Sequence, residues 1–138
     1  MSSSQTNTTS LIEDYYAAFN RGDFDGLLDL LADDVVHDIN QGRREFGKSA
    51  FRAFMHRMNQ RYREEIVDLV VMATEDGARA AAEFTVVGQY LSTDEGLPEA
   101  RGQTYRLPAG AFFEVRGGRV ARVTNYYNLS DWVQQMGG

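Results

Sequence analysis

The chain has 138 residues, a formal net charge of −6 and no cysteine. This length is typical of one domain, and the absence of cysteine excludes thiol catalysis, zinc fingers and iron–sulfur sites. The acidic balance disfavours nucleic-acid binding, which needs a basic surface, and the apolar runs are too short to span a bilayer.

The first nine residues, MSSSQTNTT, are polar. They have neither the basic start nor the apolar stretch of a signal peptide. Residues 1–9 therefore predict a disordered tail, and the default location is cytoplasmic. Residues 10–138 predict one domain, because they contain no repeat, linker or shift in composition.

Three helical patterns come first. Ser10 and Glu13 have the spacing of a capping box, and apolar residues recur at helical spacing up to Gly22. Asp23 is the expected cap of a second helix, which a short strand over residues 35–40 follows. A third helix is expected after a glycine-containing loop. Its apolar face comprises Phe51, Phe54, Met55, Met58 and Tyr62.

The period then changes from helical to alternating. Residues 66–75 and 79–91 predict two strands joined by a tight turn at Asp76–Gly77. Residues 105–116 and 119–127 predict a second hairpin, and a short C-terminal helix capped by a serine ends the chain. These elements predict an α+β cystatin-like cone, in which three N-terminal helices pack on a strongly curved, mostly antiparallel sheet and leave an apolar cavity.

Four segments resemble a known family. YYAAFNRGD (residues 15–23) and GLLDLLADD (26–34) resemble the first two helices of ketosteroid isomerases. GKSAFRAF (47–54) resembles the start of their third helix, and GRVARV (118–123) resembles the hairpin before their last strand. The chain thus resembles the NTF2-like superfamily, and most closely its ketosteroid isomerase-related, SnoaL-like branch. That superfamily includes isomerases, polyketide cyclases, epoxide hydrolases, dehydratases and non-catalytic proteins.

The resemblance assigns catalytic roles to two residues. Ketosteroid isomerases use an aspartate base, together with a tyrosine and a protonated aspartic acid that stabilise the dienolate. The tyrosine maps to Tyr15. The base maps to Ile39 or Asp38, depending on the direction of alignment, and Asp38 is favoured because isoleucine cannot transfer a proton. The acid is lost, since its position falls on Gly110 or Ala111.

His37 is an alternative base, because imidazole titrates near neutrality. A shift of one residue in the strand decides whether His37 or Asp38 faces inward. The resemblance implies a cofactor-independent, isomerase- or cyclase-type proton transfer on a carbonyl compound such as a steroid or polyketide, with Tyr15 stabilising the enolate. The alternative is a non-catalytic ligand-binding or dimerisation module, which the loss of the acid favours.

The other pocket candidates are aromatic, apolar and amide side chains, for which simple core packing is the alternative. They are Tyr16, Asn40, Phe54, Met55, Phe84, Tyr105, Ala111, Phe113, Asn125 and Trp132. No metal or cofactor is predicted, because the two histidines lack ligand spacing and the glycines form no phosphate-binding pattern. The expected partners are a small apolar molecule and, as the resemblance implies, a second copy of the chain bound through the outer sheet face. No nucleic-acid or membrane partner is expected.

Overall fold

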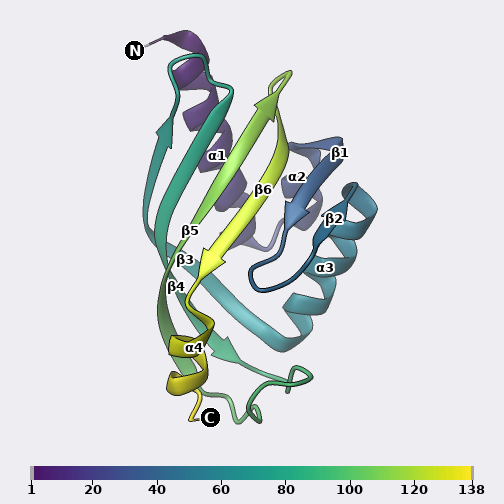
Figure 1. The fold of residues 1–138 in the computed structure, drawn as a ribbon, viewed down its shortest axis with the longest axis vertical. Helices are drawn as coiled ribbons and strands as arrows, with labels where there is room; N and C mark the ends of the chain where they lie inside the picture. The colour runs from purple at the N-terminus through teal and green to yellow at the C-terminus, as the bar shows by residue number, and fades with distance from the viewer. Residues whose placement is uncertain (1, 138) are drawn as a thin grey trace.

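The computed structural model describes residues 2–137, which form four helices and one six-stranded sheet (Figure 1). The helices are α1 (Ser3–Arg21), α2 (Phe24–Asp29), α3 (Lys48–Arg61) and α4 (Leu129–Gln135). The strands are β1 (Leu31–Asp38), β2 (Arg44–Phe46), β3 (Tyr62–Ala73), β4 (Arg79–Tyr90), β5 (Thr104–Arg116) and β6 (Arg119–Tyr127).

The sheet has the strand order β2-β1-β6-β5-β4-β3. The β1–β6 pair is parallel, and the other pairs are antiparallel. Register irregularities interrupt the pairing of β3 with β4 and of β5 with β6, and such bulges bend a sheet locally. Helices α1 and α2 lie behind the sheet in the view of Figure 1, on its concave side. The predicted α+β cone, with a short C-terminal helix, is confirmed.

Alternation along the strands decides what each face of the sheet presents. In β4 the residues Ala80, Ala82, Phe84 and Val86 are buried, while Arg79 and Glu83 on the other face are exposed, as the sequence pattern predicts. The concave face and the helices enclose a core of fully buried side chains. These include Ile12, Leu27, Leu31, Val35, Phe113, Val120 and Val123. Within residues 2–137, no helix is both long and apolar enough to cross a membrane.

Helix α1 begins well before Ser10, where the sequence pattern predicts its cap. Ser2 is the N-cap instead, because its hydroxyl accepts a hydrogen bond from a backbone amide of the first turn. Thr8 is buried, and its hydroxyl donates to the carbonyl of Gly77 in the β3–β4 turn at 2.6 Å. The disordered tail predicted for residues 1–9 is therefore wrong from the second residue onward, since contacts with the hairpin hold this polar segment helical. The first residue lies outside the described part of the chain.

The next boundaries follow the sequence signals more closely. Gly22 ends α1 in the left-handed conformation, and Asp23 caps α2 by accepting a hydrogen bond from the Gly26 amide at 2.9 Å. Strand β2 lies where only a loop is predicted. At the C-terminal end, α4 is capped by Asn128, two residues before the predicted serine cap, Ser130.

Candidate functional site

A cavity of about 440 Å³ lies between the concave sheet face and the helices. Its volume is within the range of pockets that bind small organic molecules. Most of its wall is apolar and aromatic, including Phe19, Phe51, Phe54, Phe84, Leu107 and Trp132. Some polar side chains interrupt this wall, in addition to the tyrosines: Asn20, Arg21, His37, Asn40, Asn59, Arg63, Glu64 and Asn125. An apolar cavity with a small set of polar groups is suited to an apolar ligand that carries a few oxygen atoms.

His37 is the imidazole in this wall. Alternation along β1 turns Val35 and His37 inward, and His37 is only 2% exposed. The rings of Phe51 and Phe54 lie 4.6 Å and 4.7 Å from its centroid, and its Nε2 lies 3.3 Å from Nδ2 of Asn125. Burial lowers the pKa of His37 below its ordinary value of 6.5, although nearby carboxylates act in the opposite direction. The ring is therefore neutral at pH 7 and able to accept a proton.

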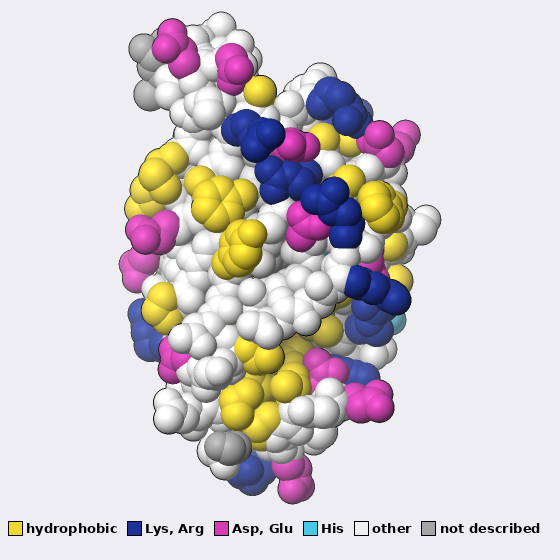
Figure 2. All heavy atoms as spheres, in the orientation of Figure 1, with side chains coloured by type: hydrophobic (Ala, Val, Ile, Leu, Met, Phe, Trp, Pro, Cys, Tyr) yellow, Lys and Arg dark blue, Asp and Glu magenta, His cyan; other side chains and the backbone are white. Residues whose placement is uncertain are grey.

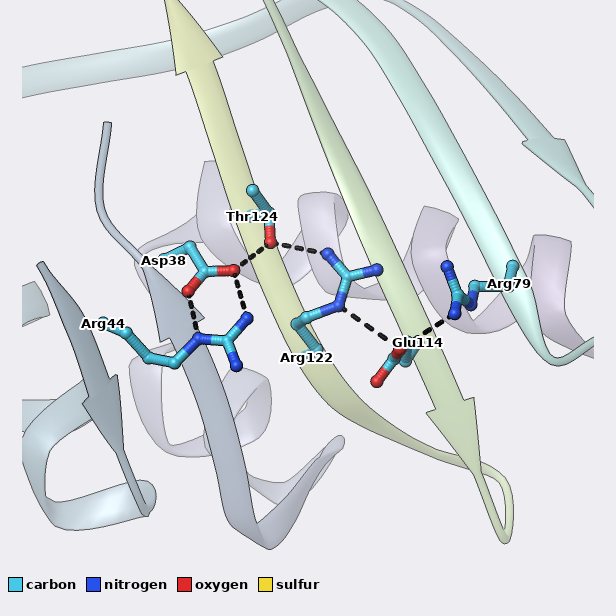
Figure 3. A network of polar contacts seen from close by, with 6 residues as sticks. All are labelled: Asp38, Arg44, Arg79, Glu114, Arg122 and Thr124. Atoms are coloured by element: carbon cyan, nitrogen blue, oxygen red, sulfur yellow. Dashed lines mark hydrogen bonds and ion pairs between the residues drawn. The ribbon is translucent and has the colours of Figure 1, made fainter. Parts of the chain in front are cut away.

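Asp38 lies on the opposite face of the sheet, so the expectation that it faces the pocket is wrong. Figure 3 shows its carboxylate in a polar network on the outer side, away from the helices. Arg44 donates to it from Nε at 2.6 Å and from Nη2 at 3.1 Å, and the Thr124 hydroxyl donates at 2.6 Å. The hydrogen bond from Arg44 is the main cause that lowers the pKa of Asp38 to about 2. A carboxylate held in this way is a weak base and does not reach the cavity.

Tyr15 and Tyr16 both line the cavity from α1. Their rings meet edge to face with centroids 5.0 Å apart, and Tyr15 also packs edge to face on Phe113 at 5.6 Å. Burial raises the pKa of both phenols, so both keep their protons. The Tyr16 hydroxyl is buried and has no hydrogen-bond partner among the described residues. Each phenol can donate a hydrogen bond to a ligand oxygen.

Glu64 is a cavity residue that the sequence analysis missed. It enters from β3 between Tyr62 and Ile66, which share its face of the strand. Burial raises the pKa of Glu64, and a hydrogen bond donated by the Tyr105 hydroxyl opposes that rise. The predicted strand begins at Ile66, two residues later, so Glu64 was not among the predicted pocket residues. The alternation of Tyr62, Glu64 and Ile66 with charged residues was the signal that would have found it.

The remaining predicted pocket residues fall into two groups. Six of them line the cavity: Asn40, Phe54, Met55, Phe84, Asn125 and Trp132. Three lie behind its wall: Tyr105, which bonds Glu64, and Ala111 and Phe113, which are 1% and 0% exposed in the core. The Asn40 side chain donates to the backbone carbonyl of Tyr127 at 3.0 Å and so ties the end of β1 to the end of β6. In the described part of the chain, no three histidine or carboxylate side chains gather to hold a metal ion.

Comparisons with known proteins show the same fold and one family. The family model of the SnoaL-like domain matches residues 12–123. A solved structure from Xanthomonas campestris pv. campestris is 56% identical, covers 97% of this chain and 99% of its own, and has a TM-score of 0.95. One from Pseudomonas putida KT2440 is 64% identical, with 93% and 96% covered and a TM-score of 0.91. Both carry the provisional name polyketide cyclase.

A more distant structure shares the fold alone. It is an epoxide hydrolase of M. tuberculosis, 21% identical, with 96% of this chain and 90% of its own covered and a TM-score of 0.72. A search of curated proteins finds no match. The extent of the family match and the identity to the two bacterial structures establish that this chain is a member of the SnoaL-like domain family.

Proposed function

We propose that the protein catalyses a cofactor-independent proton transfer on a small, largely apolar carbonyl compound of the steroid or polyketide type. One observation carries the proposal: a single cavity holds two titratable groups whose environments move their pKa values in opposite directions. The pKa of His37 is lowered and that of Glu64 is raised. Such a pair brings a proton acceptor and a proton donor toward the same pH range, as acid–base catalysis requires.

In the proposed reaction, Nε2 of His37 removes a proton from the carbon beside the carbonyl group, which leaves an imidazolium and an enolate. The contact between Nε2 and Asn125 is 3.3 Å, longer than most hydrogen bonds, so a ligand can displace it. The displaced amide and the unpartnered Tyr16 hydroxyl then donate to the enolate oxygen.

The enolate has two outcomes. In an isomerisation the proton returns to a different carbon of the same compound. In a cyclisation the enolate carbon bonds to a second carbonyl carbon, and the resulting alkoxide takes up the proton. Glu64 enters from β3, at the far end of the sheet from His37 on β1, and is suited to exchange a proton there. The provisional name of the two bacterial relatives favours the cyclisation.

Deuterium exchange tests the proposal. The protein is incubated in D₂O with a panel of apolar ketones and diketones, and proton NMR follows the loss of hydrogen beside each carbonyl. We expect His37→Gln to slow this exchange by about 100-fold or more, the range typical of a general base. Asp38→Asn is the matched control, because its carboxylate lies outside the cavity, and it retains most of the exchange. Equal rates in wild type and His37→Gln would rule out the imidazole as the base.

A non-catalytic ligand-binding module is the second candidate. It is favoured by the loss of the acid that the resemblance to ketosteroid isomerases places at Gly110 or Ala111, neither of which has a side-chain donor. Native mass spectrometry of the purified protein distinguishes the two. If the protein retains an oxygenated apolar molecule and the wild type exchanges no ketone, the protein is a binding module and the proposed catalysis is ruled out.

A further inference from the structure

The short strand β2 brings a second carboxylate beside His37. In the β1–β2 register His37 stands opposite Glu45, and the next pair is Asp38 with Arg44. Directly opposed residues of antiparallel strands project to the same face, with Cβ atoms about 4.5–5.5 Å apart. Since the pair of Asp38 and Arg44 lies on the outer face, Glu45 and His37 share the inner face. Glu45 does not line the cavity and so lies behind the imidazole.

Both members of this inner pair carry a buried atom without a partner. Among the described residues, His37 Nδ1 and Glu45 Oε1 make no hydrogen bond, although both are inaccessible to solvent. The Glu45 side chain is 13% exposed, and its other oxygen lies 3.6 Å from the Arg43 guanidinium. An imidazole nitrogen can donate a hydrogen bond and a carboxylate oxygen can accept one. Leaving both atoms buried without a partner is energetically unfavourable, so a hydrogen bond between them would stabilise the protein.

The orientation of the ring decides which nitrogen faces which strand. Strand β1 lies between β6 and β2 in the sheet. The imidazole directs Nε2 to Asn125 of β6, and the phenyl rings of Phe51 and Phe54 restrict its plane. Because Nε2 is the nitrogen on the β6 side, Nδ1 is the ring nitrogen left for a partner on β2, where Glu45 stands opposite His37.

We infer that Glu45 is a positioning residue for His37, whose Oε1 accepts the Nδ1 proton and so leaves Nε2 as the nitrogen that faces a ligand. The catalytic role of this pair rests on the proposed function, whereas the pairing itself rests on the geometry of β1 and β2. The two atoms make no hydrogen bond in the structure, so a rotation of the carboxylate, or one bridging water, completes the pair. In that arrangement the carboxylate also stabilises the imidazolium that forms when Nε2 takes a proton.

The other charged groups around His37 do not replace Glu45. Asp38, on β1 itself, is already paired with Arg44 on the outer face. From α3 and β6, the neighbours in contact with the ring are phenyl and amide groups, which carry no charge. Of the two carboxylates that raise the pKa of His37 against the effect of burial, Glu45 has the larger effect and Asp38 the smaller.

Nitrogen-15 NMR of the two histidines tests the inference without any substrate. In wild type we expect the neutral His37 ring to carry its proton on Nδ1. In Glu45→Gln we expect its pKa to fall by roughly one unit and the tautomer to become mixed. His56, which is exposed on α3, is the internal reference, and Glu65→Gln, an exposed position on β3, is the matched control. An unchanged tautomer and pKa in Glu45→Gln would overturn the inference.

Two further readouts keep the test decisive. If Glu45→Gln does not fold, the wild-type spectrum decides instead, because a neutral His37 ring that carries its proton on Nε2 would overturn the inference. In the exchange assay, Glu45→Gln is expected to lower kcat by about tenfold to a hundredfold and leave KM nearly unchanged, since Glu45 does not touch the ligand. If Glu45→Gln changes the tautomer and pKa of His37 but the wild type exchanges no ketone, the proposed function is wrong and the pair of His37 and Glu45 stands. If exchange depends on His37 but Glu45→Gln leaves the tautomer and pKa of His37 unchanged, the proposed function stands and the pair is wrong.

Discussion

His37 and Asp38 are adjacent in the chain and lie in opposite environments. One is buried against phenyl rings with its pKa lowered by desolvation, and the other is an ion pair on the outer face with its pKa held at about 2. The cause is the strand itself, because successive side chains of β1 point to opposite faces. Of these two side chains only the imidazole lines the cavity, and the carboxylate of Asp38 contributes to the stability of the sheet.

The pH dependence of stability reports on Asp38. Its pKa is lower in the folded protein than the ordinary 3.8, so its contribution is present above pH 3.8 and is lost as the pH falls to about 2. Because the Arg44 side chain is 53% exposed, solvent screening reduces that contribution to about 1 kcal/mol. We expect Asp38→Asn to lower the free energy of unfolding by that amount at pH 6 and to approach wild type near pH 2. Urea denaturation at the two pH values measures it, and a deficit at pH 2 as large as that at pH 6 would contradict the assignment.

At the scale of elements, the first turns of α1 depend on the β3–β4 hairpin. Thr8 is 4% exposed and donates to the Gly77 carbonyl, in a turn where Gly77 has a positive φ of 71°. A side chain at Gly77 would meet the backbone of α1 at 2.6 Å, so the turn and the helix fit closely. This contact is the reason that a polar segment, weak as an isolated helix, is helical here.

Replacing the Thr8 hydroxyl tests this contact. We expect Thr8→Val to leave the Gly77 carbonyl buried without a donor and to lower the free energy of unfolding by about 1–2 kcal/mol. Thr6→Val is the matched control, because Thr6 is exposed and bonds only within its own helix. Chemical denaturation compares the two variants. Equal stability of both would mean that residues 3–9 contribute little to the fold.

At the scale of the whole molecule, the outer face of the sheet carries both apolar and charged side chains. Figure 2 shows yellow side chains beside a diagonal band of blue and magenta ones. Across the strands, Met72 and Phe112 stand in one row, and Val70 and Tyr126 stand in the next. All four are half exposed or more, and Phe112 and Tyr126 meet edge to face with centroids 5.8 Å apart. Exposed aromatic and methionine side chains grouped in this way are typical of an interface.

We expect this face to join two copies of the chain, as the family resemblance implies. Phe112→Arg would place a charge in the centre of the apolar rows and convert a dimer to monomers. Leu91→Arg is the control, since Leu91 is 39% exposed and directly follows the last residue of β4, away from these rows. Sedimentation velocity over a range of concentrations measures the outcome. A wild type that is monomeric throughout, or a Phe112→Arg protein that stays dimeric, would exclude the dimer at this face.

The sequence by itself determined the class of the fold and most of its elements. Periods of 3.6 and 2, together with Gly22, Asp23 and the Asp76–Gly77 turn, are local signals, and local backbone preferences do not depend on distant residues. The apolar wall of the cavity was also predictable. Phe54, Phe84 and Trp132 are large side chains on the inward faces of their elements. In a cone, the inward-facing side chains of the helices and the sheet surround the same central cavity.

Only the tertiary structure decided the chemistry of the site. The register of β1 turned His37 inward and Asp38 outward, and a shift of one residue would have reversed them. Strand β2 and the early start of β3, both outside the bounds of the predicted strands, then brought Glu45 and Glu64 to the inner side of the sheet. The register depends on pairing between segments far apart in the chain, and the pKa of each group depends on how deeply that pairing buries it.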